Sequence, residues 1–282
     1  MKIANTIKEV REIINEWKSE GLSIGLVPTM GFLHEGHTSL MKIASENDRV
    51  VVSIFLNPIQ FGPKEDLSSY PKDFESDRAK CEANGVDLIF APAAAEMYDG
   101  MFSTYVDMTG LTEELCGLSR PGHFRGVCTV VSKLFNIISP DKAYFGEKDA
   151  QQLAVVKRMV KDLNFNLEVV GCPIIREPDG LAMSSRNTYL NESQRKAAVI
   201  LSKSIKIGKE LVMAGEMDAS EVISQMKAVI ESEPLTRIDY IKVVDSNSLV
   251  AVDRIDRPVL VAIAVFIGTT RLIDNFSYMP SM

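Results

Sequence analysis

Apolar residues recur along this chain in two alternating patterns. Over residues 6–20 they keep a helical spacing, and Thr6 and Glu9 form a capping box that begins this predicted helix. Short apolar runs follow, each separated from the next by another segment of helical spacing. The predicted strands are 24–27, 50–55, 87–90, 142–145 and 167–170, and the predicted helices are 36–47, 71–84 and 121–138, with a further helix that starts near residue 149. Short strands that alternate with helices predict an α/β fold with a doubly wound parallel sheet.

The last third of the chain has a different order of elements. Its predicted helices are 192–214 and 218–232, and its predicted strands are 238–244, 258–267 and 271–276. We therefore expect a Rossmann-like domain over residues 1–176 and a smaller α+β domain over residues 177–282. A hinge is expected near 176–187, so that the smaller domain can act as a lid.

Composition and charge exclude several classes of protein. The chain has 282 residues, 46% of them hydrophobic and 24% charged, as in ordinary globular proteins. Its net charge of −7 argues against a general binder of nucleic acid or of acidic membranes. The longest apolar run, residues 258–267, is too short to span a bilayer. The four cysteines show no CxxC pair, which favours reduced thiols in a cytoplasmic protein.

The segment after the first predicted Rossmann-type strand carries the first candidate chemistry. Residues 28–40 join that strand to a helix start through a turn that contains Gly31 and Gly36. Unpaired backbone N–H groups at such a turn, together with the helix dipole, favour a bound anion. His34 and His37, three residues apart, lie on one face of the first helical turn and can donate to phosphate oxygens. The segment predicts a nucleotide phosphate site.

Other interpretations of the two histidines are weaker. A single histidine is more often a surface or core residue than a catalytic one, but this chain has only three histidines and two lie in this turn. The H-x-x-H spacing also suits metal ligation. No cysteine or third histidine lies nearby, so we give zinc little weight.

Polar residues also follow the second Rossmann-type strand. Asn57 and Gln60 lie in a loop whose prolines end the strand, and parallel strands place this loop at the same sheet edge as the histidines. Amides orient polar substrates without adding charge. A Pro-Gly turn with incidental amides is an equally good interpretation of this segment alone. The polar connection that follows, up to about Tyr70, is long enough to be a mobile flap.

Three later segments add positive charge and hydroxyl groups. Lys148 follows the strand at 142–145, where an ammonium group would meet phosphate, while Asp149 has the more frequent role of a helix cap. Gln152 lies one turn further along the same helix. The segment 184–186, Ser-Ser-Arg, combines two hydroxyl groups with a permanent charge, a pattern that is weak by itself. For residues 120–125 the sequence leaves structural, positional and interfacial roles open.

Together these segments resemble the pantothenate synthetase (pantoate–β-alanine ligase) family over nearly the whole chain. The matching motifs, in chain order, are PTMGFLHEGH, FLNPIQFG, RPGHFRG, FGEKDAQQL and DGLAMSSRN. The first is similar to the HxGH signature of a wider adenylate-forming and nucleotidyl-transfer superfamily, and MSSRN is similar to its KMSKS-type loop. FLNPIQFG and FGEKDAQQL are the motifs that point to this family and not to the wider superfamily.

The resemblance implies an ATP- and Mg²⁺-dependent ligase that joins (R)-pantoate to β-alanine through a pantoyl adenylate and releases AMP and pyrophosphate. It implies catalytic roles for His34, His37 and Lys148, with Mg²⁺ held mainly by the ATP phosphates, and a homodimer formed through the N-terminal domain. Pantoate and β-alanine would contact Asn57, Gln60 and Gln152. The implied ATP-binding residues are Met30, Gly31, Phe32, Leu33, His34, Glu35, Gly36, His37, Gly146, Glu147, Lys148, Asp149, Ile175, Met183, Ser184, Ser185 and Arg186.

Two other functions remain open from the sequence. A nucleotidyltransferase of the same superfamily would keep the AMP on its product, and the histidine motif does not separate it from a ligase. A non-catalytic nucleotide-binding module would keep the fold, although the intact histidines and Lys148 argue against it. No base for the β-alanine amine is evident.

Overall fold

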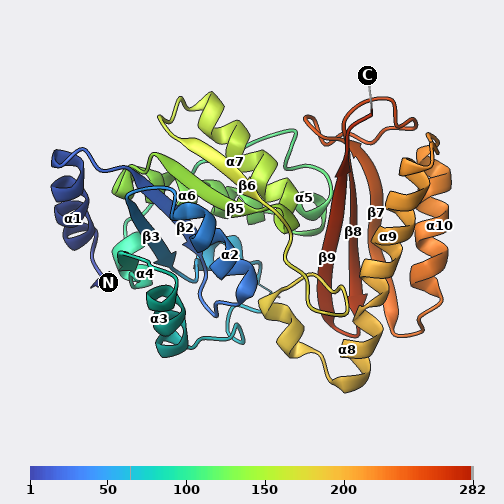
Figure 1. Cartoon of the computed structure of the whole chain (residues 1–282), viewed down its shortest axis with the longest axis horizontal. Coiled ribbons are helices and arrows are strands. Elements are labelled where there is room, and N and C mark those ends of the chain that lie inside the picture. Colours follow the sequence, from blue (N-terminus) through green and yellow to red (C-terminus); the bar gives the residue numbers. More distant parts are fainter. Residues whose placement is uncertain (64, 281–282) are drawn as a thin grey trace. The chain divides into compact units, whose positions relative to one another are not determined.

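The chain forms two compact units in a computed structural model that describes residues 1–63 and 65–280 (Figure 1). Each unit is built from more than one stretch of sequence. The first consists of Met1–Met108, Arg120–Glu147 and Gln152–Pro173, and the second of Thr109–Ser119, Lys148–Gln151 and Ile174–Met282. Two short segments that precede the main body of the second unit in the sequence therefore belong to it.

The first unit contains a six-stranded parallel sheet with strand order β1-β4-β3-β2-β5-β6. Its strands are β1 (Lys2–Ala4), β2 (Ile24–Thr29), β3 (Arg49–Ile54), β4 (Leu88–Phe90), β5 (Lys142–Gly146) and β6 (Glu168–Cys172). The predicted fold class is confirmed. The sequence analysis missed β1, because three residues at a sheet edge, two of them exposed, carry no detectable periodicity.

The strand β2 runs two residues further than predicted, through Pro28 and Thr29, which pair with β3. A proline is compatible with this strand because β2 pairs with β5 only at Gly25 and Leu26. The longer strand carries the chain straight into the histidine segment.

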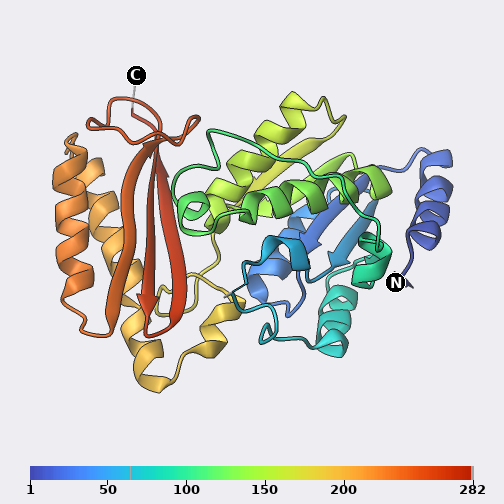
Figure 2. The ribbon, with the colours of Figure 1, turned by 180° about the vertical axis from the view of Figure 1, so that it is seen from behind.

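Helices cover both faces of this sheet. Contacts of α2 with β2 and β5 place it on one face (Figure 1), and α6 packs on the opposite face together with α1, as the reverse view shows (Figure 2). The helices are α1 (Ile7–Ser19), α2 (Glu35–Ala44), α3 (Phe74–Ala83), α4 (Ala94–Met97), α6 (His123–Ile138) and α7 (Ala150–Asp162). The capping box predicted for Thr6 and Glu9 is present at the start of α1.

The single tryptophan of the chain, Trp17, belongs to the first unit. It lies on the buried side of α1 with 6% of its surface exposed. The guanidinium of Arg49 lies 5.7 Å from the centre of a Trp17 ring, which adds a cation–π contact to the apolar packing.

The second unit is an antiparallel sheet with strand order β7-β8-β9, and α9 and α10 pack against it (Figure 1). Its elements are α5 (Cys116–Ser119), α8 (Glu192–Ala198), α9 (Ile200–Met213), α10 (Ala219–Glu231), β7 (Thr236–Asp245), β8 (Val259–Ile267) and β9 (Thr270–Tyr278). The predicted helix over 192–214 is two helices that meet at Val199, whose N–H bonds to Ala197 O and so leaves the regular helical pattern. No glycine or proline marks that break in the sequence.

All four cysteines are free, and three of them are buried. Burial raises the pKa of Cys81 and Cys128 to about 12 and that of Cys172 to about 11, so these thiols stay protonated at neutral pH. Within residues 1–63 and 65–280, none of the helices combines the length and the apolar character that crossing a bilayer requires.

Candidate active site

The turn between β2 and α2 brings the two predicted histidines together. Gly31 and Phe32 adopt left-handed backbone angles, with φ of +85° and +53°, and this reverses the chain before α2 begins at Glu35. His34 is the N-cap residue of α2 and His37 lies one turn later, so that their ring centres are 4.1 Å apart. The predicted placement on one helical face is confirmed.

Hydrogen bonds fix the tautomer of both rings. The N–H of Gly36 donates to His34 Nδ1 over 3.1 Å, and the N–H of His34 donates to His37 Nδ1 over 3.2 Å. Each Nδ1 is therefore an acceptor, and the proton of the neutral ring is on Nε2. The two imidazoles form a reciprocal capping box in which both rings are N–H donors through Nε2.

Backbone N–H groups of this turn are largely used within the protein, which differs from the expectation of an open anion site. The donors with internal acceptors are Gly31, Phe32, Leu33, His34, Gly36 and His37. The predicted anion site is therefore not built from open backbone N–H groups of this turn.

A buried carboxylate accounts for two of these bonds. Asp77 on α3 is 2% exposed, and it accepts the N–H of Phe32 over 2.8 Å and that of Leu33 over 2.6 Å. Burial raises the pKa of Asp77, and the two N–H groups act in the opposite direction. A cavity of about 850 Å³ lies against the same turn and is lined in part by Met30, Phe32 and Asp77.

The predicted amide pair is present at the end of the neighbouring strand. Asn57 directly precedes a 3₁₀ turn, Pro58–Gln60, and Gln60 is its last residue. Both are buried, with 1% and 8% of their surface exposed. The Nδ2 of Asn57 donates to Gly126 O over 3.1 Å and to Gln60 Oε1 over 2.9 Å. Because a carbonyl can only accept, these bonds set the direction of both amides.

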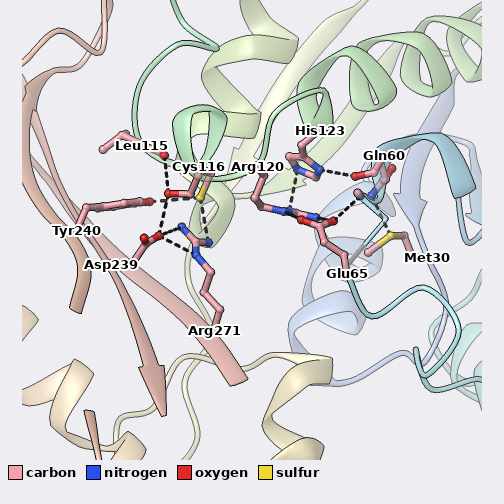
Figure 3. Close-up of polar contacts among 12 residues, drawn as sticks. Met30, Gln60, Glu65, Leu115, Cys116, Arg120, His123, Asp239, Tyr240 and Arg271 are labelled. Carbon is pink, nitrogen blue, oxygen red and sulfur yellow. Dashed lines mark hydrogen bonds and ion pairs between the residues drawn. The ribbon is translucent and has the colours of Figure 1, made fainter. Parts of the chain in front are cut away.

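The Gln60 amide therefore presents its NH₂ group toward the histidine turn. Its Nε2 lies 3.0 Å from Met30 Sδ, as Figure 3 shows. On the other side of Asn57, the hydroxyl of Tyr98 donates to Asn57 Oδ1 over 2.7 Å. Burial raises the pKa of Tyr98, so its hydroxyl keeps its proton. Sequence analysis gave no sign of Tyr98, which lies 41 residues after Asn57 in the chain.

The close approach of α6 explains a glycine of the RPGHFRG motif. A Cβ atom on Gly126 would lie 2.5 Å from Ile59 O and from Gln60 Cα. Only glycine lets the helix backbone reach the amide turn at this point.

Arg120 and His123, in the segment whose role the sequence left open, contact the amide turn and the connection that follows it (Figure 3). The Nδ1 of His123 lies 2.9 Å from Gln60 O, and Arg120 Nη1 lies 3.1 Å from His123 Nε2. Since the carbonyl can only accept and the guanidinium can only donate, His123 is neutral with its proton on Nδ1. Arg120 also forms a bidentate ion pair with Glu65, with distances of 2.6 and 2.7 Å. This pair bonds Glu65, in the connection that is long enough to be a flap, to the start of the segment that leads into α6.

Lys148 and Asp149 belong to the second unit. Their charged groups lie 3.6 Å apart, and the carbonyl of Lys148 accepts from Asn275 Nδ2 on β9 over 2.9 Å. The neighbouring Gln151, which we did not single out, is buried and bonds to Leu111 O, Glu114 O and the N–H of Cys116. Gln152 is half-buried at the start of α7.

The Ser-Ser-Arg segment is part of a well-bonded loop of the second unit. Ser184 caps a 3₁₀ turn, Ser185–Tyr189, by accepting the N–H of Arg186. Upstream, Arg176 forms two bonds of 2.6 and 2.9 Å to the buried Asp274 on β9. The remaining ATP candidates, Ile175 and Met183, are joined by a backbone bond of 2.9 Å.

A second polar cluster in this unit surrounds the half-buried Cys116 (Figure 3). Its Sγ lies 3.3 Å from Tyr240 Oη and 3.5 Å from Arg271 Nη1. Arg271 also binds Asp239, with an Nη2–Oδ2 distance of 2.8 Å. Sequence analysis gave no sign of this cluster, because Cys116 and Tyr240 are 124 residues apart in the chain.

The predicted site residues therefore fall into two groups. Within the first unit, His34 is paired with His37, and Met30 contacts Gln60, which is bonded to Asn57. The first unit also contains Gly146, Glu147 and Gln152, whereas Lys148, Asp149, Ile175 and the segment 183–186 belong to the second.

Comparisons with known proteins give full-length matches. A family model described as pantoate-beta-alanine ligase matches residues 2–277. The pantothenate synthetase of Ruminiclostridium cellulolyticum is 63% identical over 280 residues, which cover 99% of this chain and 100% of that protein. The crystal structure of pantothenate synthetase from Thermus thermophilus has a TM-score of 0.95 at 43% identity and covers 99% of this chain and 100% of that one. The pantoate-beta-alanine ligase of Francisella tularensis, solved with beta-gamma ATP and beta-alanine, has a TM-score of 0.80 at 34% identity, with coverage of 98% and 97%.

Proposed function

This chain belongs to the pantoate-β-alanine ligase family and is a ligase, and from that premise we propose the course of its reaction and the residues that carry it. The reaction condenses (R)-pantoate with β-alanine, consumes ATP and releases AMP and pyrophosphate, with a pantoyl adenylate as intermediate. The observation that carries this proposal is the pair of Nε2–H histidines in the turn that begins at Met30, together with the buried, oriented Gln60 amide that contacts Met30. Adenylation requires N–H donors for phosphate and a neutral donor for a carboxylate, and the imidazoles and the Gln60 amide can supply them.

The first step is an attack of the pantoate carboxylate on the α-phosphorus of ATP. One oxygen–phosphorus bond forms, the bond to the pyrophosphate oxygen breaks, and the electron pair leaves with pyrophosphate. Such transfers need positioning and charge stabilisation more than a protein nucleophile. His34, His37 and Lys148 supply that field, while Gln60 Nε2 donates to pantoate. Asn57 keeps the Gln60 amide in this direction, since its own Nδ2 group already has two acceptors in the protein.

The second step joins the two substrates. The unprotonated amine of β-alanine attacks the acyl carbon, the carbon–nitrogen bond forms, and the carbon–oxygen bond to AMP breaks. AMP departs with the electron pair, and the amine loses a proton. Gln60 and Gln152 hold pantoate in this proposal.

The nucleotide is held by the residues that the resemblance implies. They are Met30, Gly31, Phe32, Leu33, His34, Glu35, Gly36, His37, Gly146, Glu147, Lys148, Asp149, Ile175, Met183, Ser184, Ser185 and Arg186. The bonded 3₁₀ turn after Ser184 supports this assignment, because it gives the Ser-Ser-Arg segment one defined backbone conformation.

Magnesium enters this proposal with the nucleotide. Within residues 1–63 and 65–280, no group of three His, Cys, Asp or Glu side chains is arranged to hold a metal. Oxygen ligands from ATP phosphates suit Mg²⁺, and the ion neutralises phosphate charge when bound. We also propose a cytoplasmic homodimer formed through the N-terminal domain, with residues 177–282 as a lid domain.

Product analysis tests the proposal. Purified protein is incubated with Mg-ATP and pantoate, with and without β-alanine. We expect AMP and pyrophosphate in equal amounts, with a new amide only when β-alanine is present. A persistent adenylated product would instead indicate a nucleotidyltransferase, and ATP binding without consumption would indicate a binding module.

A further inference from the structure

We propose that Asp77 is a positioning residue for the histidine turn, and that its carboxylate holds residues 31–33 so that His34 and His37 present their Nε2–H groups together. This inference concerns a residue to which the proposed reaction gives no role, and for its kinetic part it rests on the proposed function. Asp77 touches neither ATP nor pantoate in that reaction and acts through the backbone of the turn.

The geometry of the carboxylate carries the argument. Asp77 is almost fully buried on α3, and each of its oxygens accepts one backbone N–H of the turn, from Phe32 and from Leu33. A charged acceptor makes stronger hydrogen bonds than a neutral one, and a buried carboxylate that loses such bonds is costly. The two bonds therefore couple the position of α3 to the backbone that precedes the histidines.

The turn needs such a constraint because its backbone is unfavourable. Phe32 has φ of +53°, a left-handed conformation that a residue with a bulky side chain rarely adopts. The preceding Gly31 has φ of +85°, and a Cβ added to it would lie 3.2 Å from Asp77 Oδ2. The carboxylate thus fills the space beside the turn and stabilises the left-handed conformation with two hydrogen bonds.

The conformation of residues 31–33 affects the imidazoles because it determines how the chain enters α2. The bonds from Gly36 N to His34 Nδ1 and from His34 N to His37 Nδ1 require the chain to enter α2 at the observed angle. If residues 31–33 relax, the N-cap geometry is lost and both rings can exchange tautomers. The turn would then present a mixture of donors and acceptors to phosphate.

The decisive experiment uses Asp77→Asn, which keeps the side-chain volume and replaces one acceptor oxygen by an NH₂ group that faces a backbone N–H. The ring ¹⁵N signals of the three histidines in the nucleotide-free protein report their tautomers. In the unmodified protein we expect Nε2–H for His34 and His37, and Nδ1–H for His123, which serves as an internal reference. In Asp77→Asn the first two should move toward a tautomer mixture while His123 is unchanged.

Kinetics provide the second readout. We expect the pantoate-dependent release of pyrophosphate to lose at least about tenfold in kcat, while the KM for pantoate changes less than about threefold, because the removed bonds orient the phosphate donors. The matched control is Asp73→Ala, which removes the N-cap bond from Ser76 N to Asp73 Oδ1 at the start of the same helix. It destabilises α3 without touching the turn, so its histidine signals and kcat should stay close to those of the unmodified protein.

The outcomes separate this inference from the proposed function. Unchanged His34 and His37 signals in folded Asp77→Asn would overturn the inference, as would an equal change in Asp73→Ala. If Asp77→Asn does not fold, Asp77→Glu, which keeps a carboxylate on the same helix, replaces it and should move the same two signals less. The histidine signals need no substrate, so a failure of the ligase assay in the unmodified protein would count against the proposed function alone.

Discussion

The turns after β2 and β3 lie at the ends of neighbouring parallel strands but are held in opposite ways. The histidine turn is held by a buried carboxylate, Asp77. The amide turn is held by neutral groups, namely Asn57, the Tyr98 hydroxyl and the carbonyl of Gly126. In both cases the turn is bonded to groups from a later segment of the chain, which are Asp77 for the histidine turn and Tyr98 and Gly126 for the amide turn. The buried groups that bond to each turn therefore determine which donors face outward at this edge of the sheet.

Removing a donor from the histidine turn should give the largest effect. We expect His37→Ala to lose about 10²–10³ in the rate of adenylation, since that is the usual effect of removing one pre-organised donor. Lys148→Ala should lose as much. Pantoate-dependent pyrophosphate release measures both. Lys142→Ala, which removes a surface lysine paired with Glu46, is the control and should remain active, and an alanine variant with near-normal release would remove its residue from the mechanism.

Displacing the amide turn should have the next largest effect. In Gly126→Ala the new methyl group must push away Ile59 O and Gln60 Cα. Overpacking of this kind costs about 1–3 kcal/mol, which corresponds to roughly fivefold to 150-fold in affinity. We therefore expect the KM for pantoate to rise by that factor, with a smaller change in the KM for ATP. Gly100→Ala, where a Cβ meets nothing within 4 Å, should be neutral. Equal rises in both KM values would show that the two turns are not held separately.

A smaller change should follow the loss of one hydroxyl group. Tyr98→Phe removes the donor to Asn57 Oδ1, and a neutral hydrogen bond contributes about 1 kcal/mol, which corresponds to a rise of roughly fivefold in the KM for pantoate. The histidine tautomers should be unchanged. Tyr105→Phe, at an exposed tyrosine of the same segment, is the matched control. A larger loss for Tyr105→Phe than for Tyr98→Phe would contradict the role of the hydroxyl.

The smallest expected effect is on thermal stability at low pH, through the ion pair of Glu65 with Arg120. Burial acts to raise the pKa of Glu65, but the contact with Arg120 outweighs it, and the pKa lies below its usual range. A lowered pKa means that the ion pair stabilises the fold at neutral pH and that this contribution is lost as the pH falls from about 4.3 through the lowered value. Glu65→Gln should therefore lower Tm at neutral pH, and the difference from the unmodified protein should vanish in stronger acid. A constant difference in thermal denaturation would contradict this assignment.

The sequence was sufficient to predict most of the strands and several polar side chains that follow them. Hydrophobic periodicity located five of the six parallel strands and all three antiparallel ones, and His34, His37 and Gln60 were evident because they follow such strands. The buried residues that hold the two turns were not evident from the sequence. Asp77 looks like an ordinary helix surface residue, and Tyr98 and Gly126 gain their roles from contacts that cross 41 and 69 residues. Hydrophobic periodicity shows which face of a helix or strand is buried. It does not show which polar side chains are buried together with that face.

The single tryptophan has a consequence for how the folding of this protein can be followed. Trp17 lies in the first unit, and the second unit contains none. Tryptophan fluorescence will therefore record the unfolding of the parallel sheet and its helices, while calorimetry records both units. Coincident midpoints would show one cooperative transition, and separate midpoints would show that the antiparallel sheet melts by itself.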